Sequence, residues 1–189
     1  MESTSATTTY HRLAVDGVSV FYREAGPREA TTIVLLHGFP SSSRQFDTLI
    51  PLLATRYHLV APDFPGFGQS EAPPPSSYAY TFDHLAATMS DLLDQLKISK
   101  CAFYLHDYGG PIGFRIMLAH PKRVQALIIQ NANVYQEGLG AKWAGIARLV
   151  RSKRAPRSVR CVRVVRSNRT TPYARDLASR AIQSGHLDG

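Results

Sequence analysis

The sequence lacks any long apolar run and any targeting signal. No stretch approaches the roughly 20 consecutive apolar residues that a transmembrane helix needs, although 44% of the 189 residues are hydrophobic. Residues 1–9 carry neither the basic cluster nor the apolar centre of a secretory signal, so we expect them to form a disordered tail. These absences indicate a cytoplasmic protein with no membrane association.

Cysteine is scarce as well. The two cysteines are Cys101, in an apolar run, and Cys161, in a basic one. Two residues in such different surroundings form neither a disulfide framework nor a metal-ligand cluster, and they suit a reducing compartment. We therefore expect no metal site and no cofactor.

Acidic residues are nearly absent from one end of the chain. Residues 1–147 carry 11 Lys and Arg against 12 Asp and Glu, whereas residues 148–189 carry 11 against 2, so the last 42 residues supply the net charge of +8. Arginine occurs at every third position from 148 to 169, a spacing that leaves no apolar face on a helix or a strand. We expect a near-neutral core over residues 10–147 and a separate basic segment, 148–189, for which no fold is predicted.

Apolar segments alternate regularly over the first two thirds of the chain. Asp16-Gly17, between two alternating runs, predicts an antiparallel hairpin. Short apolar runs typical of buried strands and segments with helical spacing follow in turn. The predicted strands are 32–36, 57–61, 101–105 and 126–129, and the predicted helices are 46–53, 83–97 and 110–118. This order predicts an α/β fold with a mostly parallel sheet that helices cover on both faces.

One junction in this pattern carries a reactive group. The strand 101–105 leads through Asp107 into Gly109-Gly110, where the next helix begins. Glycines at the start of a helix let the chain turn sharply, and the helix N-terminus favours a negative charge. We therefore expect the carboxylate of Asp107 on an exposed strand-to-helix turn, where a nucleophile would stand. The alternative is that Asp107 only caps the helix.

Three motifs lie in order at the ends of predicted strands. They are HGFP at residues 37–40, DFPGFGQS at 63–70 and HDYGG at 106–110. Together they resemble motifs of the α/β-hydrolase superfamily, and more closely those of its branch with an aspartate nucleophile, which includes epoxide hydrolases and haloalkane dehalogenases. The resemblance covers residues 10–147. It implies the α/β-hydrolase fold and an enzyme acting on a small molecule with an electrophilic carbon: an epoxide, an alkyl halide or an ester.

The resemblance also implies a role for each motif. Asp107 would attack an sp³ carbon and form an alkyl ester on the enzyme, which water then hydrolyses. The backbone N–H groups of Phe39 and Tyr108 would form the oxyanion hole for that second step. Residues 63–70 would line the pocket without taking part in the chemistry. Other motif residues would shape the oxyanion loop and the pocket, and they are His37, Gly38, Pro40 and His106.

The side chains beside the nucleophile favour one subfamily. Haloalkane dehalogenases of this type hold the departing halide between side-chain N–H donors. Here Phe39 has no donor and Tyr108 has only a hydroxyl. An epoxide hydrolase-like reaction is therefore the first hypothesis, and a haloalkane dehalogenase-like reaction is the alternative.

The catalytic partners of Asp107 are missing from the pattern. In this fold a histidine after the last strand activates the hydrolytic water, and an acid from an earlier strand orients it. His186 has a similar local sequence but no strand or acid before it, and strand 126–129 is followed by Gln130-Asn131 rather than an acid. We therefore expect hydrolase sequence to stop near residue 147, as a truncation or shifted reading frame would cause, with activity absent or impaired.

In that case the sheet would be incomplete at its C-terminal edge, and the strand 126–129 would be exposed. We therefore expect poor solubility or dependence on another chain. A different hypothesis makes the chain a noncatalytic fragment, or a binding module that uses the basic segment on an acidic surface. That segment has one aromatic residue, Tyr173, and no recognition-helix pattern, which argues against nucleic acid as a partner. Nothing in the sequence specifies an oligomeric state.

Overall fold

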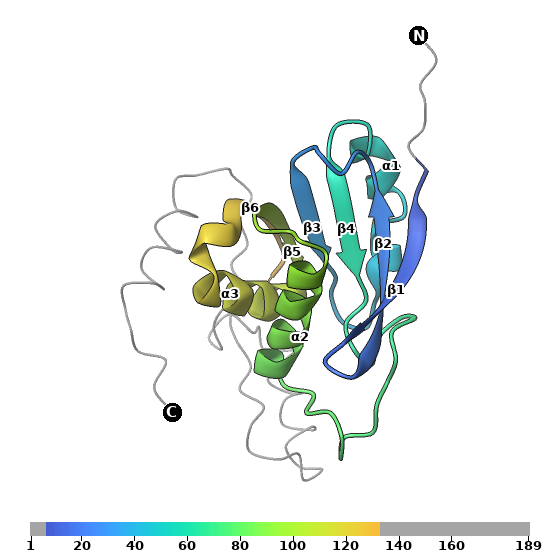
Figure 1. The fold of residues 1–189 in the computed structure, drawn as a ribbon, viewed down its shortest axis with the longest axis vertical. Helices are drawn as coiled ribbons and strands as arrows, with labels where there is room; N and C mark the ends of the chain where they lie inside the picture. Colours follow the sequence, from blue (N-terminus) through green and yellow to red (C-terminus); the bar gives the residue numbers. More distant parts are fainter. Residues whose placement is uncertain (1–6, 133–189) are drawn as a thin grey trace.

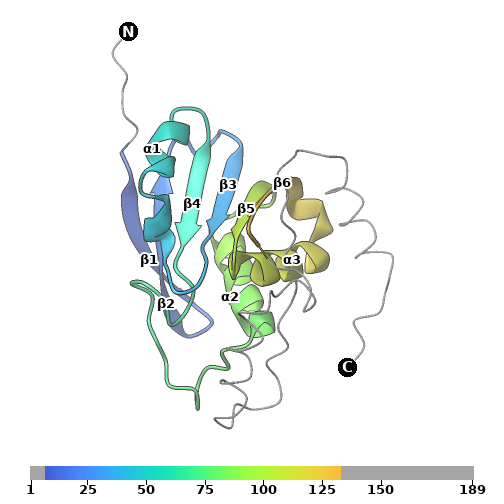
Figure 2. The same cartoon turned by 180° about the vertical axis from the view of Figure 1, so that it is seen from behind.

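A computed structural model describes residues 7–132. These residues form one six-stranded sheet with helices on both faces, as Figure 1 and Figure 2 show from opposite sides. The order across the sheet is β1-β2-β4-β3-β5-β6. The strands are β1 (Thr9–Val15), β2 (Val18–Ala25), β3 (Thr32–Leu36), β4 (His58–Pro62), β5 (Cys101–His106) and β6 (Val124–Gln130).

The first two strands form the predicted antiparallel hairpin. Asp16 and Gly17 both have positive φ angles, 52° and 71°, as the two central residues of a tight hairpin turn require. β1 begins at Thr9, one residue inside the expected tail, because Thr9 pairs with Glu24 of β2. β2 also pairs antiparallel with β4, whereas β3, β4, β5 and β6 run parallel. The mostly parallel sheet with an N-terminal hairpin is therefore confirmed.

The two faces of the sheet bury separate apolar clusters. Along β3, Ile33 and Leu35 belong to one cluster, and Val34 and Leu36 belong to the other. This alternation follows from the period of two in a strand, and continuous burial on both faces explains why β3 reads as an unbroken apolar run.

Helices cover both clusters. The 3₁₀ turn η1 (Ser43–Phe46) and α1 (Leu49–Leu53) cover one face, and α2 (Phe82–Gln95) and α3 (Gly109–Ala119) cover the other. Figure 1 shows α2 and α3 side by side in front of the sheet, and Figure 2 shows α1 on the opposite side. The predicted doubly covered sheet is thus confirmed over the described residues.

One helix prediction is wrong in part. The spacing over residues 46–53 predicts one helix, but the structure divides this stretch between η1 and α1. Pro51, in the first turn of α1, has no N–H with which to bond the carbonyl of Asp47, so the α-helix does not extend back into η1. A second 3₁₀ turn, η2 (Pro121–Arg123), follows α3 and leads into β6.

The far edge of the described sheet is exposed. Within residues 7–132, β6 is an edge strand, and Ile128 in its middle is 44% exposed. This agrees with the exposed position expected for strand 126–129. The basic segment 148–189 lies outside the described residues. No helix in the described part is both long and apolar enough to cross a bilayer.

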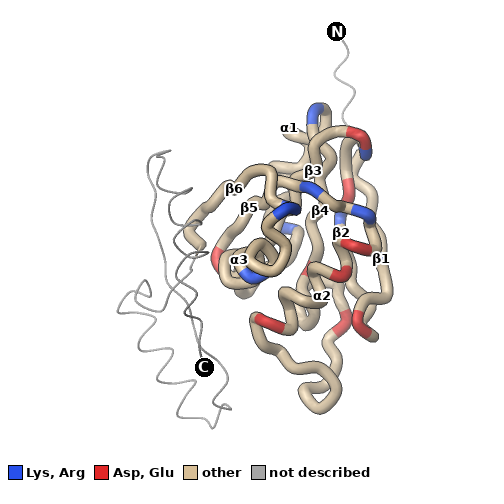
Figure 3. Tube along the Cα trace, turned by 60° about the vertical axis from the view of Figure 1, so that its left-hand side comes forward, with Lys and Arg blue, Asp and Glu red and all other residues tan. Residues whose placement is uncertain are grey.

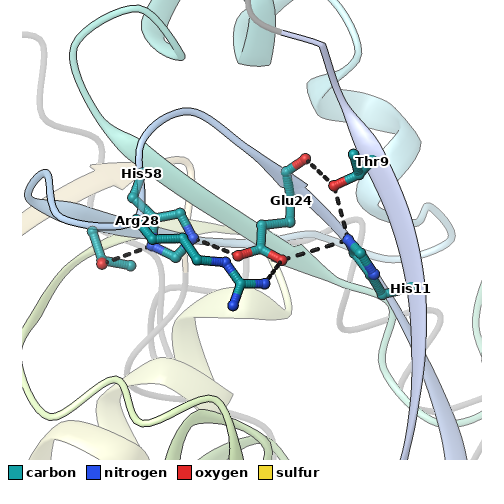
Figure 4. Close-up of polar contacts among 6 residues, drawn as sticks. Thr9, His11, Glu24, Arg28 and His58 are labelled. Atoms are coloured by element: carbon teal, nitrogen blue, oxygen red, sulfur yellow. Dashed lines mark hydrogen bonds and ion pairs between the residues drawn. The ribbon is translucent and has the colours of Figure 1, made fainter.

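An ionic cluster around the buried Glu24 and His58 lies at the end of the sheet where β3 and β4 begin (Figure 4). Glu24 accepts hydrogen bonds from Nε2 of His58 and from the guanidinium of Arg28, each at 2.8 Å. Nε2 of His11 lies 3.5 Å from the same carboxylate. The hydroxyl of Thr32 is 3.0 Å from Nδ1 of His58. The cluster joins β1, β2, β3 and β4 at the end of the sheet opposite the strand ends that carry the three motifs.

Candidate active site

Asp107 lies on the turn between β5 and α3, as predicted. Its φ is +47°, a left-handed conformation that residues other than glycine rarely adopt. The turn depends on glycine after it, because a Cβ at Gly109 would lie 2.3 Å from the carbonyl oxygen of Leu36. A Cβ at Gly113 would lie 2.3 Å from Cδ2 of Leu105. α3 therefore packs directly against β3 and β5, and Asp107 stands at the carboxyl end of these strands.

Two backbone N–H groups converge on one oxygen of the Asp107 carboxylate. The N–H of Phe39 donates to Oδ1 over 2.8 Å, and the N–H of Tyr108 donates to the same atom over 2.7 Å. These are the two donors named from the sequence, and they come from different loops. The side chain of Tyr108, the N-cap residue of α3, makes no capping hydrogen bond. Because one of the two donors comes from the loop after β3, the contacts of the Asp107 carboxylate extend beyond the start of α3.

The loop after β3 reaches Asp107 because its second residue is glycine. A Cβ on Gly38 would lie 2.6 Å from Cβ of Asp107 and 2.9 Å from Cδ2 of His106. The next peptide bond, between Phe39 and Pro40, is cis. Gly38 and Pro40 thus lie where shaping of the oxyanion loop was expected.

His37 is fully buried under this loop. Its Nε2 accepts a hydrogen bond from the backbone N–H of Phe64 at 3.1 Å, and its Nδ1 lies 2.9 Å from the carbonyl oxygen of Gly38. Burial lowers the pKa of the imidazole, and the Gly38 carbonyl and the carboxylates of Asp63 and Asp107 only partly oppose this effect. The ring is therefore neutral at pH 7, and each of its two nitrogens is hydrogen-bonded to the backbone.

His106 stands beside Asp107 but is bonded to the neighbouring strand. Its Nδ1 lies 3.0 Å from the carbonyl oxygen of Gln130 in β6. The donors to the Asp107 carboxylate within residues 7–132 are the two backbone N–H groups, and no histidine of that range is among them. The structure thus brings together Asp107, Phe39 and Tyr108, whereas His186 lies outside the described residues.

Asp63 holds the loop after β4 against the loop after β3. Its Oδ1 accepts from the N–H of Ser43 at 2.6 Å, and its Oδ2 accepts from the N–H of Gln69 at 2.8 Å. Gly68 has a φ of +54°, and a Cβ there would lie 2.0 Å from Oδ2 of Asp63. The sequence does not predict these contacts of Asp63. The signal for it is a carboxylate followed by two glycines in a short loop.

Aromatic rings form a wall beside the carboxylate. The ring centroid of Tyr108 lies 5.2 Å from that of Phe39, 5.1 Å from that of Phe82 and 6.4 Å from that of Phe67. Phe39 is 49% exposed, so part of this apolar surface faces outward. Phe82 comes from α2, and no motif identified it as a site residue. Phe67 comes from the loop 63–70, which was expected to line the pocket.

Metal-ligating side chains and the Cys101 thiol are the remaining groups of chemical interest in residues 7–132. That part of the chain contains no group of three or more His, Cys, Asp or Glu side chains placed to hold a metal ion. Cys101 is buried in β5, and burial raises the pKa of its thiol to about 12, so the reactive thiolate is not formed at neutral pH.

Several known proteins are similar to this chain in sequence and in fold. A family model described as alpha/beta hydrolase fold matches residues 31–160, and so continues past residue 147. The uncharacterized hydrolase YNR064C of Saccharomyces cerevisiae is 50% identical over 137 residues, which are 72% of this chain and 47% of that protein. Epoxide hydrolase 4 of Mus musculus is 35% identical over 125 residues, which are 66% of this chain and 34% of that protein.

A solved structure extends the similarity to three dimensions. The haloalkane dehalogenase DbeA from Bradyrhizobium elkani USDA94 superposes with a TM-score of 0.68 and 29% identity, over 80% of this chain and 52% of that one. The chain thus spans about half the length of such relatives, or less. Since the family model covers more than half of its residues and the sheet has the same architecture, this chain belongs to the α/β-hydrolase family.

Proposed function

We propose that Asp107 is the nucleophile of a hydrolase that opens a small electrophile through an alkyl-ester intermediate. The observation that carries the proposal is the pair of backbone N–H groups on Oδ1. They engage one oxygen of the carboxylate, which supports attack by the other, Oδ2. A carboxylate suits displacement at an sp³ carbon, because the resulting ester is then open to attack by water at Cγ.

The reaction takes two steps on the same side chain. First, Oδ2 bonds to an epoxide carbon while the bond from that carbon to the epoxide oxygen breaks, and the oxygen keeps the electron pair and takes a proton from water. Second, water attacks Cγ and gives a proton to the hydroxide left by the first step, and negative charge develops on Oδ1 between the N–H groups of Phe39 and Tyr108. Donors placed in advance stabilise such charge strongly. The bond from Cγ to the alcohol oxygen then breaks, and that oxygen takes the proton of the new carboxyl group. Loss of the diol then restores the carboxylate.

The aromatic wall supports an epoxide with an apolar substituent as the substrate. Its four rings offer apolar contact area, and the single polar atom among them is the phenolic oxygen of Tyr108. None of the four carries the indole or amide N–H that a departing halide would need. A haloalkane dehalogenase-like reaction is the second candidate, supported by the structural match to DbeA.

We propose further that the ester is hydrolysed slowly by this chain. Activation of water needs a base, and within residues 7–132 the two histidines next to the site, His37 and His106, are each bonded to a backbone carbonyl through Nδ1. The alkyl-enzyme should therefore accumulate.

Intact-protein mass spectrometry tests this proposal. The full chain is incubated with styrene oxide, and we expect a single covalent adduct that peptide mapping places on Asp107. Asp107→Ala should give no adduct, whereas Asp91→Ala, which removes an exposed carboxylate of α2, should react like the unmodified chain. Faster alkylation by n-hexyl bromide, with release of bromide, would favour the second candidate. An adduct elsewhere, or none with either reagent, would contradict a nucleophilic Asp107.

A further inference from the structure

The hydrogen bonds of His37 determine which of its nitrogens carries the proton. The backbone N–H of Phe64 can only donate, so Nε2 must accept with its lone pair. A neutral imidazole then has its proton on Nδ1. The partner of Nδ1 is the carbonyl oxygen of Gly38, which can only accept. If Nε2 were protonated as well, its N–H would point at the backbone N–H of Phe64, and the hydrogen bond between them would be lost.

The surroundings favour this neutral form. The His37 side chain is fully buried, and its ring centroid lies 4.2 Å from that of Phe64 and 5.5 Å from that of Phe67. An imidazolium there would lose hydration against apolar rings. The titratable groups that act on the ring are Asp63, Asp107 and His106.

The acceptor of the Nδ1 proton belongs to the peptide unit that reaches Asp107. The carbonyl of Gly38 and the N–H of Phe39 are the two ends of one planar peptide group and point in opposite directions. The carbonyl end accepts from His37 and also from the N–H of Ser41 at 3.0 Å. The N–H end donates to Oδ1 of Asp107 at 2.8 Å. Two donors on the carbonyl fix the plane, and they also strengthen the N–H as a donor.

We infer that His37 is a positioning residue, whose neutral ring, with its proton on Nδ1, orients and polarises the Gly38–Phe39 peptide toward Asp107. The inference rests on the proposed function of Asp107 and adds to it a residue that touches no substrate. It also removes His37 from the candidates for the base, because both ring nitrogens are engaged with the backbone.

The tautomer is measured in the unmodified full chain. Nitrogen NMR of the His37 imidazole should show a protonated Nδ1 and an unprotonated Nε2 at neutral pH. A protonated Nε2, or an imidazolium at neutral pH, would overturn the inference. This measurement needs no variant and no reaction at Asp107.

Two substitutions separate the two hydrogen bonds. His37→Asn places an amide N–H near the position of Nδ1 and keeps the bond to Gly38. His37→Gln places an amide oxygen near the position of Nε2 and keeps the bond from Phe64. Each variant loses one bond, so we expect similar decreases in melting temperature.

The rate at which hydroxylamine cleaves the ester then measures the effect of the oxyanion hole, because hydroxylamine needs no base from the protein. It attacks Cγ of the preformed Asp107 ester, leaves a hydroxamate on the protein and releases the alcohol. We expect His37→Gln to slow this release about 10- to 100-fold, because removal of one oxyanion donor typically costs 100-fold or more. His37→Asn should react like the unmodified chain, and all three should react alike once denatured.

Equal rates in His37→Gln and the unmodified chain, or equal losses in both variants, would overturn the inference. If the unmodified chain forms no alkyl-enzyme, the proposed function fails but the inference about His37 can still be tested. The NMR chemical shift of the Phe39 amide proton then replaces the rate of hydroxylamine cleavage as the measurement. An upfield shift of that proton in His37→Gln alone supports the inference, and an unchanged shift overturns it.

Discussion

At the residue scale, the position of Asp107 depends on how closely the main chain approaches it. Gly38 lets the loop after β3 lie against the side chain, and Gly109 lets α3 lie against β3. A larger residue at either position would come closer than van der Waals packing allows. Backbone rather than long side chains thus places the donors around the carboxylate, and a rigid donor needs no reorganisation when charge develops.

Gly38→Ala should therefore disable the site more than it destabilises the fold. The added Cβ would lie 2.6 Å from Cβ of Asp107, so the loop must move and the bond from Phe39 to Oδ1 is lost. Because the added Cβ also pushes the Asp107 side chain out of its attacking position, we expect its alkylation by styrene oxide to slow at least ~10-fold. The free energy of unfolding should fall by about 1–3 kcal/mol.

The matched control is Gly17→Ala in the hairpin turn. Gly17 has a φ of +71° and open space around it, so alanine there strains the backbone without touching the site. It should lower stability and leave the alkylation rate unchanged. Alkylation at the normal rate in Gly38→Ala would show that the close approach of the loop is unnecessary.

The residues of the site differ in how far they could be predicted. Asp107, Phe39 and Tyr108 lie in motifs at the ends of parallel strands, and such ends meet at one edge of the sheet, so their convergence follows from the order of elements. Asp63 acts on the backbone of a different loop, and Phe82 packs on Tyr108 from a helix. Neither contact follows from residue type or spacing, because both depend on the finished tertiary packing.

At the element scale, most predicted segments match the structure to within two residues at each end. The strand predicted over 101–105 is Cys101–His106, and the helix predicted over 83–97 is Phe82–Gln95. The prediction of a single helix over residues 46–53 is wrong because the missing N–H of one proline has a larger effect on helix formation than a few apolar positions with helical spacing. Short elements have few residues with which to average out such an effect.

The Glu24 cluster should make stability depend on pH (Figure 4). Burial raises the pKa of Glu24, but hydrogen bonds from His58 and Arg28 outweigh burial, so the net pKa is below its usual value of 4.5. A carboxyl whose pKa is lowered on folding stabilises the protein above its unfolded pKa. That stabilisation is lost as the pH falls through the folded pKa. The free energy of unfolding should therefore decrease at acidic pH.

Glu24→Gln tests this dependence. We expect urea unfolding at pH 7 to show a loss of about 1–3 kcal/mol, because the amide replaces one acceptor oxygen with a donor. The difference from the unmodified chain should shrink as the pH falls below 4.5. Glu29→Gln, an exposed carboxylate, is the control and should change little at any pH. A difference that stays constant between pH 7 and acidic pH would contradict the assignment. His11 and His58 face Glu24 and are unchanged in all three proteins.

The exposed edge strand should promote self-association. β6 is at the edge of the described sheet with Ile128 44% exposed, and an apolar edge strand is a template for pairing with another chain. Ile128→Lys should increase the monomer fraction in sedimentation velocity, with stability changed by no more than about 0.5 kcal/mol. Leu52→Lys removes a more exposed apolar residue, on α1, and should have no such effect. Equal effects of both changes would implicate general apolar exposure instead of the edge.

At the scale of the whole molecule, charge is divided along the chain. Residues 7–132 contain 10 Lys and Arg and 10 Asp and Glu, and Figure 3 shows both signs along the described part. The net charge of +8 is therefore carried outside the part that holds the candidate site. Binding to a polyanion and reaction at Asp107 should be separable, because different residues supply them.

Replacing the eight arginines at every third position from 148 to 169 by glutamine tests this separation. The change removes a positive charge equal to the whole net charge, so we expect retention on heparin at low salt to be lost, since such binding depends on phosphate-like contacts and counterion release. Alkylation of Asp107 by styrene oxide should continue at the same rate. The control replaces four exposed cations of the described part, Arg44, Arg56, Lys97 and Lys100, and should leave most of the retention in place. Undiminished retention in the arginine variant would show that these eight arginines do not form the polyanion-binding surface. A slower alkylation would show that the basic segment contributes to the site.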